Sequence, residues 1–99
     1  MLHYNYLIVG SGLAGLFTAL RASHYGSVAI VTKSNLSESN SYFAQGGIAS
    51  VIGEDDLPIF HYTDTIKAGR GLCNHKAVQI LVNEGPLRVA QLIEEGMKF

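Results

Sequence analysis

The glycine-rich run G-S-G-L-A-G at residues 10–15 constrains the fold more than any other feature of the sequence. The apolar run directly before it, residues 6–9, is typical of a strand that is buried on both faces. A second apolar run, residues 28–31, predicts another strand of the same kind. Between them, apolar residues at helical spacing predict a helix with one stripe toward a core; they are Leu13, Leu16, Phe17 and Leu20. The sequence therefore predicts an α/β fold that opens with a strand–helix–strand unit whose strands are parallel.

Each of the three glycines has a separate physical role in such a unit. The first would allow a tight turn off the strand, the second would let a diphosphate approach the backbone, and the third would let the helix pack closely against the strands. The N-terminus of the helix directs N–H groups and partial positive charge at the same point. We therefore predict a dinucleotide-binding loop made of Gly10, Ser11, Gly12, Leu13, Ala14 and Gly15.

The end of the second strand leaves the identity of the dinucleotide open. Sites of this kind usually carry Asp or Glu about 20 residues after the glycines, where the carboxylate holds ribose hydroxyls. Here the strand ends in Thr32 and Lys33 instead. Lys33 could meet the 2′-phosphate of NADP, or Lys33 and the Thr32 hydroxyl could contact the adenosine part of FAD. Both could also be ordinary residues at the end of a strand.

The stretch N-S-Y-F-A-Q-G-G at residues 40–47 favours FAD over NADP. FAD extends beyond a strand–helix–strand unit, so a segment after the second strand must pass along the cofactor. Two adjacent glycines would let the backbone lie close to a flat ring or a phosphate, and backbone N–H groups and an amide side chain can bond the polar edge of the ring. The predicted flavin-contacting residues are Asn40, Ser41, Tyr42, Phe43, Ala44, Gln45, Gly46 and Gly47.

Helices are predicted for most of the chain after a short strand at residues 48–52. Asp55 and Asp56 are placed to cap a helix that begins near Leu57 and ends near Gly69.

Two further helices are predicted beyond that point. Asn74 is a favourable N-cap for the first of them, and Gly85 favours its end. Pro86 favours the start of the last helix. The residues predicted to face inward on this helix are Val89, Ala90, Ile93 and Met97.

Composition argues against several classes of function. The net charge of the 99 residues is −1, and the basic residues are scattered, so no nucleic-acid partner is expected. No apolar run approaches the roughly 20 residues of a transmembrane helix. The single cysteine, Cys73, cannot form an internal disulfide, which fits a reducing cytoplasm. The four histidines lack the spacing of metal ligands, so no metal is expected.

Four blocks of the sequence resemble the L-aspartate oxidases. They are L-I-V-G-S-G-L-A-G, V-T-K, S-Y-F-A-Q-G-G-I-A and H-Y-T-D-T-I-K-A-G-R-G-L-C-N, and they keep the order and spacing of that family. L-aspartate oxidases belong with the flavoprotein subunits of succinate dehydrogenase and fumarate reductase. The resemblance implies a Rossmann-type FAD-binding domain in an enzyme that oxidises L-aspartate to iminoaspartate. Oxygen or fumarate would be the electron acceptor, the product would enter quinolinate and NAD synthesis, and quinolinate synthase would be a partner.

The resemblance also assigns roles to single positions. Residues 11–14 match the pyrophosphate loop of the family, Lys33 matches its lysine on the adenosine side, and residues 40–47 match its second flavin-contacting segment. Asn40 stands where succinate dehydrogenases and fumarate reductases typically carry the histidine that bonds FAD covalently. The resemblance therefore implies FAD that is held non-covalently. The alternatives are a fumarate reductase-like or succinate dehydrogenase-like flavoprotein and a non-catalytic dinucleotide-binding fragment.

The resemblance covers nearly the whole chain, although the enzymes of the family are several times longer. Their substrate-binding and proton-transferring His and Arg residues are expected downstream, some in a capping domain, so no catalytic residue is assigned here. We expect residues 1–99 to be the N-terminal portion of the FAD-binding domain, without the capping and C-terminal domains. Such a portion should be inactive alone and should expose apolar helix faces and sheet edges.

Overall fold

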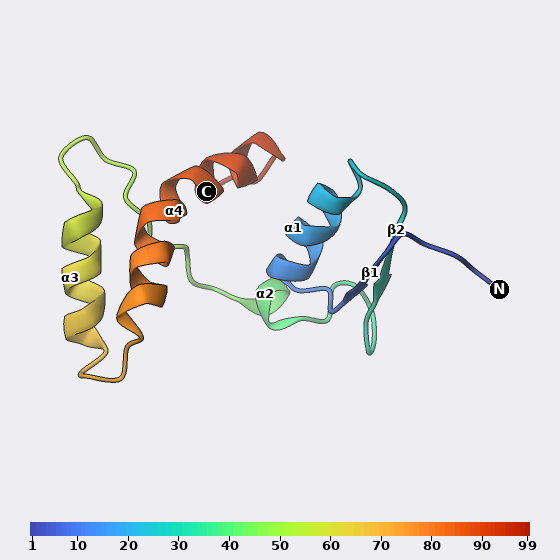
Figure 1. The fold of residues 1–99 in the computed structure, drawn as a ribbon, viewed down its shortest axis with the longest axis horizontal. Coiled ribbons are helices and arrows are strands. Elements are labelled where there is room, and N and C mark those ends of the chain that lie inside the picture. The colour runs from blue at the N-terminus through green and yellow to red at the C-terminus, as the bar shows by residue number, and fades with distance from the viewer. The chain divides into compact units, whose positions relative to one another are not determined.

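The computed structural model describes residues 1–99 and divides into two compact units, residues 1–46 and residues 47–99. The first unit contains β1 (Tyr6–Val9), α1 (Leu13–Ala22), β2 (Val28–Val31) and the short α2 (Asn40–Phe43). The second contains α3 (Pro58–Ala68) and α4 (His75–Glu94). Figure 1 shows these elements along the chain.

The first unit is the predicted strand–helix–strand unit. β1 and β2 pair in parallel, with Tyr6 opposite Val28 and Val9 opposite Val31. α1 packs on one face of this two-stranded sheet and contacts both strands (Figure 1). Because the register is unshifted, the carboxyl ends of the two strands lie side by side.

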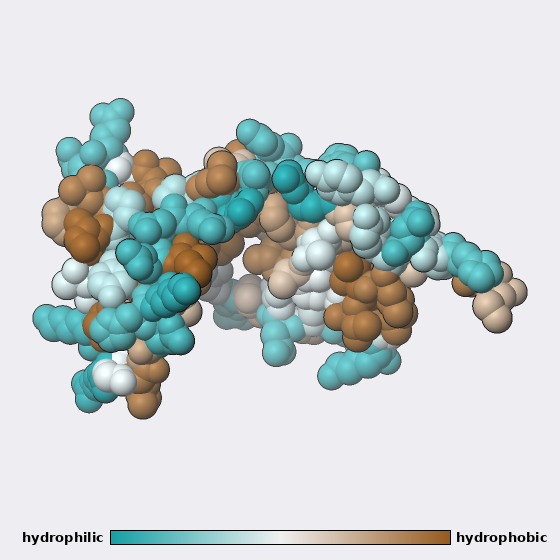
Figure 2. Space-filling view, in the orientation of Figure 1, coloured by the Kyte–Doolittle hydropathy of each residue, from teal (hydrophilic) through white to brown (hydrophobic).

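Burial of the strands differs from the prediction. Leu7 is 64% exposed and Val9 is 80% exposed, so β1 is not buried on both faces. The reason is that α1 covers one face of the sheet only, and β1 and β2 each have a strand on one side alone. Figure 2 shows hydrophobic side chains gathered over the strands on the face in view. The expected exposure of apolar sheet surface is therefore observed.

The stripe on α1 is also less buried than predicted. Leu13, Leu16 and Leu20 remain 36%, 39% and 47% exposed. Only the small Ala19, on the same helix, is buried. A sheet of two strands is too narrow to cover the whole apolar face of a helix, so the core of this unit is small.

The strand predicted at residues 48–52 is wrong, because this segment forms neither a helix nor a strand. A strand requires a neighbour for its hydrogen-bond ladder, and the only strand pair in the structure is β1 with β2. The segment packs instead against α4, where a Cβ added to Gly85 would come within 3.1 Å of Ser50 Oγ.

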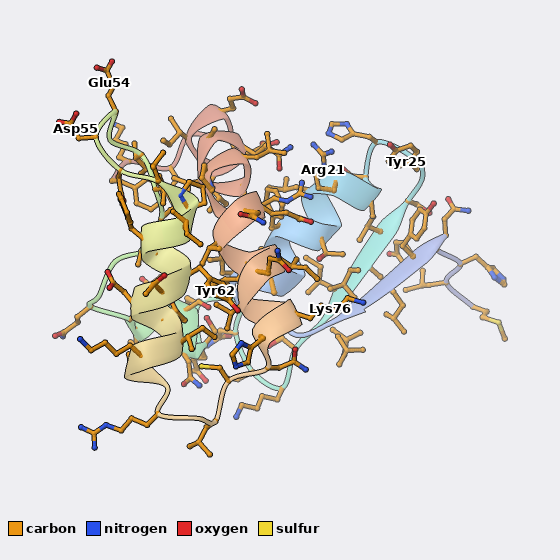
Figure 3. All side chains as sticks on the ribbon, turned by 60° about the vertical axis from the view of Figure 1, so that its left-hand side comes forward. Arg21, Tyr25, Glu54, Asp55, Tyr62 and Lys76 are labelled. Atoms are coloured by element: carbon orange, nitrogen blue, oxygen red, sulfur yellow. The ribbon has the colours of Figure 1, made fainter.

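α3 has the predicted bounds but a different N-terminal cap. It begins at Pro58 and is followed by the C-cap Gly69, as predicted. Its N-cap is Leu57, whose side chain accepts no hydrogen bond. Pro58 occupies the first helical position and thereby places Asp56 one residue too early to reach the second or third amide of the helix. Asp56 Oδ1 accepts a hydrogen bond from the Leu57 amide at 2.9 Å instead, and Asp55 projects away from the helix (Figure 3).

α4 joins what the sequence predicted as two helices. Asn74 is its N-cap, as predicted, and Asn74 Oδ1 accepts a hydrogen bond from the Ala77 amide at 3.0 Å. The helix then continues through Gly85 and Pro86, and it bends near its middle (Figure 1). Pro86 lacks the N–H that would bond the Val82 carbonyl and its ring crowds that turn, which bends a helix without requiring it to end.

Packing on both sides of the bend explains why α4 continues. Val82 and Val89, one on each side, are 2% and 6% exposed. Of the other residues predicted to face inward, Ala90, Ile93 and Met97 are exposed. α3 and α4 lie side by side and antiparallel in Figure 1.

A side-chain contact joins the middle of α3 to the first residue of α4. Tyr62 reaches from α3 toward α4 (Figure 3), where its hydroxyl and His75 Nδ1 are hydrogen-bonded at 3.0 Å. None of the helices has both the length and the apolar character needed to cross a membrane.

Candidate functional site

A cleft of about 860 Å³ lies in the first unit, at the carboxyl ends of β1 and β2. The last residue of each strand, Val9 and Val31, lines it. Parallel α/β sheets bind ligands in this position, outside the carboxyl ends of their strands. The other lining residues are Gly10, Ser11, Gly12, Thr32, Lys33, Glu38, Ser39, Asn40 and Phe43.

The glycine run forms the turn that leads from β1 into α1. Gly10 has a φ of +108°, a conformation that only glycine adopts readily. Its N–H donates to the Val31 carbonyl at 2.8 Å, which holds the turn against the end of β2. A Cβ at Gly15 would overlap the Gly10 carbonyl oxygen, so α1 begins in direct contact with the turn. The predicted role of the third glycine in close packing is confirmed.

Ser11 connects the turn to the end of β2. Its side chain is 5% exposed, and its hydroxyl donates to Thr32 Oγ1 at 3.1 Å. This hydrogen bond fixes the two sides of the cleft relative to each other. Lys33, the residue after Thr32, also lines the cleft.

The first turn of α1 is capped by a residue far along the chain. Its N-cap residue, Gly12, offers no side chain, and the Leu13 amide donates instead to Ser41 Oγ at 3.0 Å. Ser41 belongs to α2, which begins after Ser39; Ser39 Oγ accepts from the Tyr42 amide at 3.1 Å. These bonds bring α2 against the glycine turn.

One cation and the N-terminus of α1 face the cleft. α1 has no acidic residue in its first turn, so the positive end of its dipole is not neutralised locally. Lys33 lines the cleft and forms no salt bridge, because the one salt bridge of the chain joins Arg88 and Glu84 on α4. Glu38 is the single carboxylate among the lining residues. The arrangement suits an anion that lies between the helix N-terminus and Lys33.

The structure brings part of the predicted site together. Seven predicted residues line the cleft: Gly10, Ser11, Gly12, Thr32, Lys33, Asn40 and Phe43. The remaining predicted residues lie outside the lining: Leu13, Ala14, Gly15, Ser41, Tyr42, Ala44, Gln45, Gly46 and Gly47. A Cβ at Gly46 or Gly47 would meet no atom within 4 Å, so nothing within the chain requires glycine there.

Four lining residues were missed by sequence reasoning. Val9 and Val31 could have been found from the rule that ligands bind at the carboxyl ends of parallel strands. Ser39 could have been found as a serine placed to cap a helix that starts at Asn40. Glu38 carries no local signal. No group of three or more His, Cys, Asp or Glu side chains is positioned to hold a metal ion.

Comparison with known proteins places the chain in a family. Residues 5–99 match the FAD binding domain family, FAD_binding_2. The chain is 45% identical over 97 residues to a chloroplastic L-aspartate oxidase of Oryza sativa subsp. japonica, covering 98% of the chain and 15% of that protein. It is 48% identical over 94 residues to an L-aspartate oxidase of Streptomyces coelicolor, covering 94% of the chain and 16% of that protein.

A solved structure has the same fold. A mutant of E. coli quinol fumarate reductase FrdA superimposes with a TM-score of 0.85 at 31% identity, over 96% of this chain and 17% of that one. The chain thus spans about one sixth of the length of these relatives.

The residues of the cleft fit the cofactor that the family match indicates. FAD carries an anionic diphosphate, and the cleft offers a glycine turn at φ +108°, a helix N-terminus without acidic residues and the unpaired cation of Lys33. The chain therefore belongs to the FAD binding domain family, as the FAD-binding part of an L-aspartate oxidase-like flavoprotein related to fumarate reductase.

Proposed function

We propose that this chain holds FAD non-covalently in an enzyme that oxidises L-aspartate to iminoaspartate. The observation that carries the cofactor assignment is that one cleft joins three separate segments: the glycine turn, the Thr32–Lys33 strand end and the start of residues 40–47. The substrate assignment is supported by 45% and 48% identity to L-aspartate oxidases. Oxygen or fumarate would accept the electrons, and the product would feed quinolinate and NAD synthesis.

Residues of this chain would bind and orient the cofactor, and FAD itself would supply the oxidising chemistry. The amides at the start of α1 would donate hydrogen bonds to the diphosphate, since helix N-termini attract anions. Lys33 would attract the same negative charge from the end of β2. The Ser11–Thr32 hydrogen bond, at 3.1 Å, would keep these two elements at a fixed separation when the ligand binds.

Asn40 supports non-covalent binding. It lines the cleft at the position where the resemblance implies a flavin-bonded histidine in succinate dehydrogenases and fumarate reductases. An amide side chain cannot form that bond, although it can donate and accept hydrogen bonds. The free Cys73 fits the reducing cytoplasm expected for such an enzyme.

A fumarate reductase-like function is the second candidate. It is favoured by the TM-score of 0.85 with the E. coli FrdA structure. The two candidates predict different substrates.

The purified protein should therefore be yellow, and heat or acid should release intact FAD into the supernatant. A protein that spans the length of the relatives should release peroxide with L-aspartate and not with succinate. Oxidation of succinate and not of L-aspartate would support the fumarate reductase-like function instead. A colourless protein that binds NADPH would exclude both.

Lys33→Ala tests the cleft directly. Loss of one partly solvated cation near a diphosphate should weaken FAD binding roughly three- to tenfold. The matched control is Lys67→Ala, which removes an exposed lysine from the last turn of α3, outside the cleft. Equal effects of the two variants on the dissociation constant would count against this cleft as the site.

A further inference from the structure

The first free amide of α1 already has an acceptor within the chain. The Leu13 N–H donates to Ser41 Oγ at 3.0 Å, although the two residues are 28 positions apart. The N-cap Gly12 makes no side-chain hydrogen bond of its own. Ser41 therefore satisfies one of the free N–H groups at the start of the helix.

This amide borders the cleft in which the proposed diphosphate would bind. Gly12 lines the cleft directly before Leu13, and the first amides of a helix after a glycine turn are the usual donors to phosphate. A Cβ at Gly12 would come within 3.3 Å of Ser41 Oγ, so the hydroxyl lies over the turn itself. One N–H makes one well-aligned hydrogen bond, so the hydroxyl and a phosphate oxygen compete for it.

Charge decides this competition. A hydrogen bond to an ionised oxygen is about twice as strong as one between neutral groups. The Ser41 hydroxyl is neutral, and Ser41 is an exposed residue, so water can replace the lost bond. The phosphate oxygen should therefore take over the amide.

We propose that the Ser41 hydroxyl accepts the Leu13 N–H only while no cofactor is bound. When the diphosphate binds, one of its oxygens replaces Ser41 Oγ as the acceptor of this hydrogen bond. The inference rests on the proposed function. Ser41 belongs to α2 together with Asn40 and Phe43, both of which line the cleft. Exchange at one amide therefore links binding of the diphosphate to the position of the segment predicted to contact the flavin.

The test is titration of flavin-free protein with ADP, which carries the diphosphate without the flavin ring. Ser41→Ala removes the competitor and should tighten ADP binding about fivefold, the equivalent of one side-chain cap. Ser41→Thr keeps a hydroxyl and should restore the original dissociation constant. Ser23→Ala is the matched control, because Ser23 Oγ donates to the Leu20 carbonyl at the other end of α1, at 2.6 Å, and its loss should leave ADP binding unchanged.

Several results would overturn the inference. Unchanged ADP affinity in Ser41→Ala would mean that Ser41 does not compete, and weaker affinity would make Ser41 a direct ligand. If that variant does not fold, the Leu13 amide resonance of the unaltered protein gives the answer: it must shift when ADP is added, and an unmoved resonance refutes the exchange. Failure of the unaltered protein to bind ADP or FAD at all would remove the proposed function as well, which separates the two failures.

Discussion

The two units of the chain are stabilised by different kinds of contact. In residues 1–46, side-chain hydrogen bonds join positions that are 21, 22 and 28 residues apart: Ser11 with Thr32, Asn5 with Ser27, and Leu13 with Ser41. In residues 47–99, the widest such bond spans 13 residues, from Tyr62 to His75, and the others are local. The first unit is thus stabilised by hydrogen bonds between distant segments, whereas the second depends on helix packing and helix caps.

The difference has a functional meaning. Of these three residue pairs, Ser11 and Thr32 both line the cleft, so their hydrogen bond shapes the candidate site as well as the fold. No residue that lines this cleft comes from the second unit. Substitutions at the cleft, in the first unit, should therefore change ligand binding, and substitutions in the second unit should change stability alone.

The largest effect is expected for Gly15→Ala, in the first unit. The new Cβ would overlap the Gly10 carbonyl oxygen, and a backbone atom cannot turn aside as a flexible side chain can. We expect a loss of about 1–3 kcal/mol in the free energy of unfolding, with FAD affinity at least about tenfold lower because the turn is displaced. Urea unfolding and flavin fluorescence measure the two effects.

Gly53→Ala is the matched control for that substitution. A Cβ at Gly53 would meet no atom within 4 Å, and Gly53 lies in the loop before α3. Both quantities should stay unchanged. FAD affinity that survives Gly15→Ala would show that the turn does not position the ligand, and the contrast between the units would be lost.

A smaller effect, on stability alone, is expected for Val82→Ala in the second unit. Val82 is the most buried side chain of the chain, at 2% exposure. Removing its two methyl groups should lower the free energy of unfolding by about 2 kcal/mol and leave FAD affinity unchanged. Ile80→Ala, on the exposed side of the same helix, is the control and should cost less. A parallel loss of FAD affinity in Val82→Ala would mean that the two units are coupled.

The smallest effect is expected from the helix caps of the second unit. Asn74→Ala removes the acceptor for the Ala77 amide and should cost about 1 kcal/mol. Asp55→Ala should change stability by less than about 0.5 kcal/mol, because Asp55 is an exposed residue that caps nothing. Thermal unfolding of the two variants side by side tests this, and equal losses would show that Asp55 acts as a cap after all.

The first unit could be predicted well from the sequence because its signals are local and specific. The glycine run predicts a turn that few other residues can form. The segment between the two apolar runs, residues 6–9 and 28–31, is long enough for only one helix. The parallel pairing follows from that order. Exposure of Leu7 and Val9 could not be read from the same pattern, because apolar residues indicate what a strand would bury and not what is present to cover it.

The second unit was harder because its signals conflict. Gly85 and Pro86 are ordinary marks of a helix boundary, and only the burial of Val82 and Val89 on either side reveals that α4 continues. At the candidate site, sequence reasoning found the segments and not the contacts between them. The bond from Leu13 to Ser41 depends on where α2 lies in space, which no local pattern encodes.

The bend at Gly85 and Pro86 has a consequence for how α4 melts. Each backbone hydrogen bond of a helix stabilises the turns next to it. Pro86 has no N–H, so one of these bonds is missing near the middle of α4. Each half of the helix is then shorter than the length at which an isolated helix is stable in water. Fraying that begins at Glu94 should therefore stop at the proline, and the two halves should melt as separate cooperative segments.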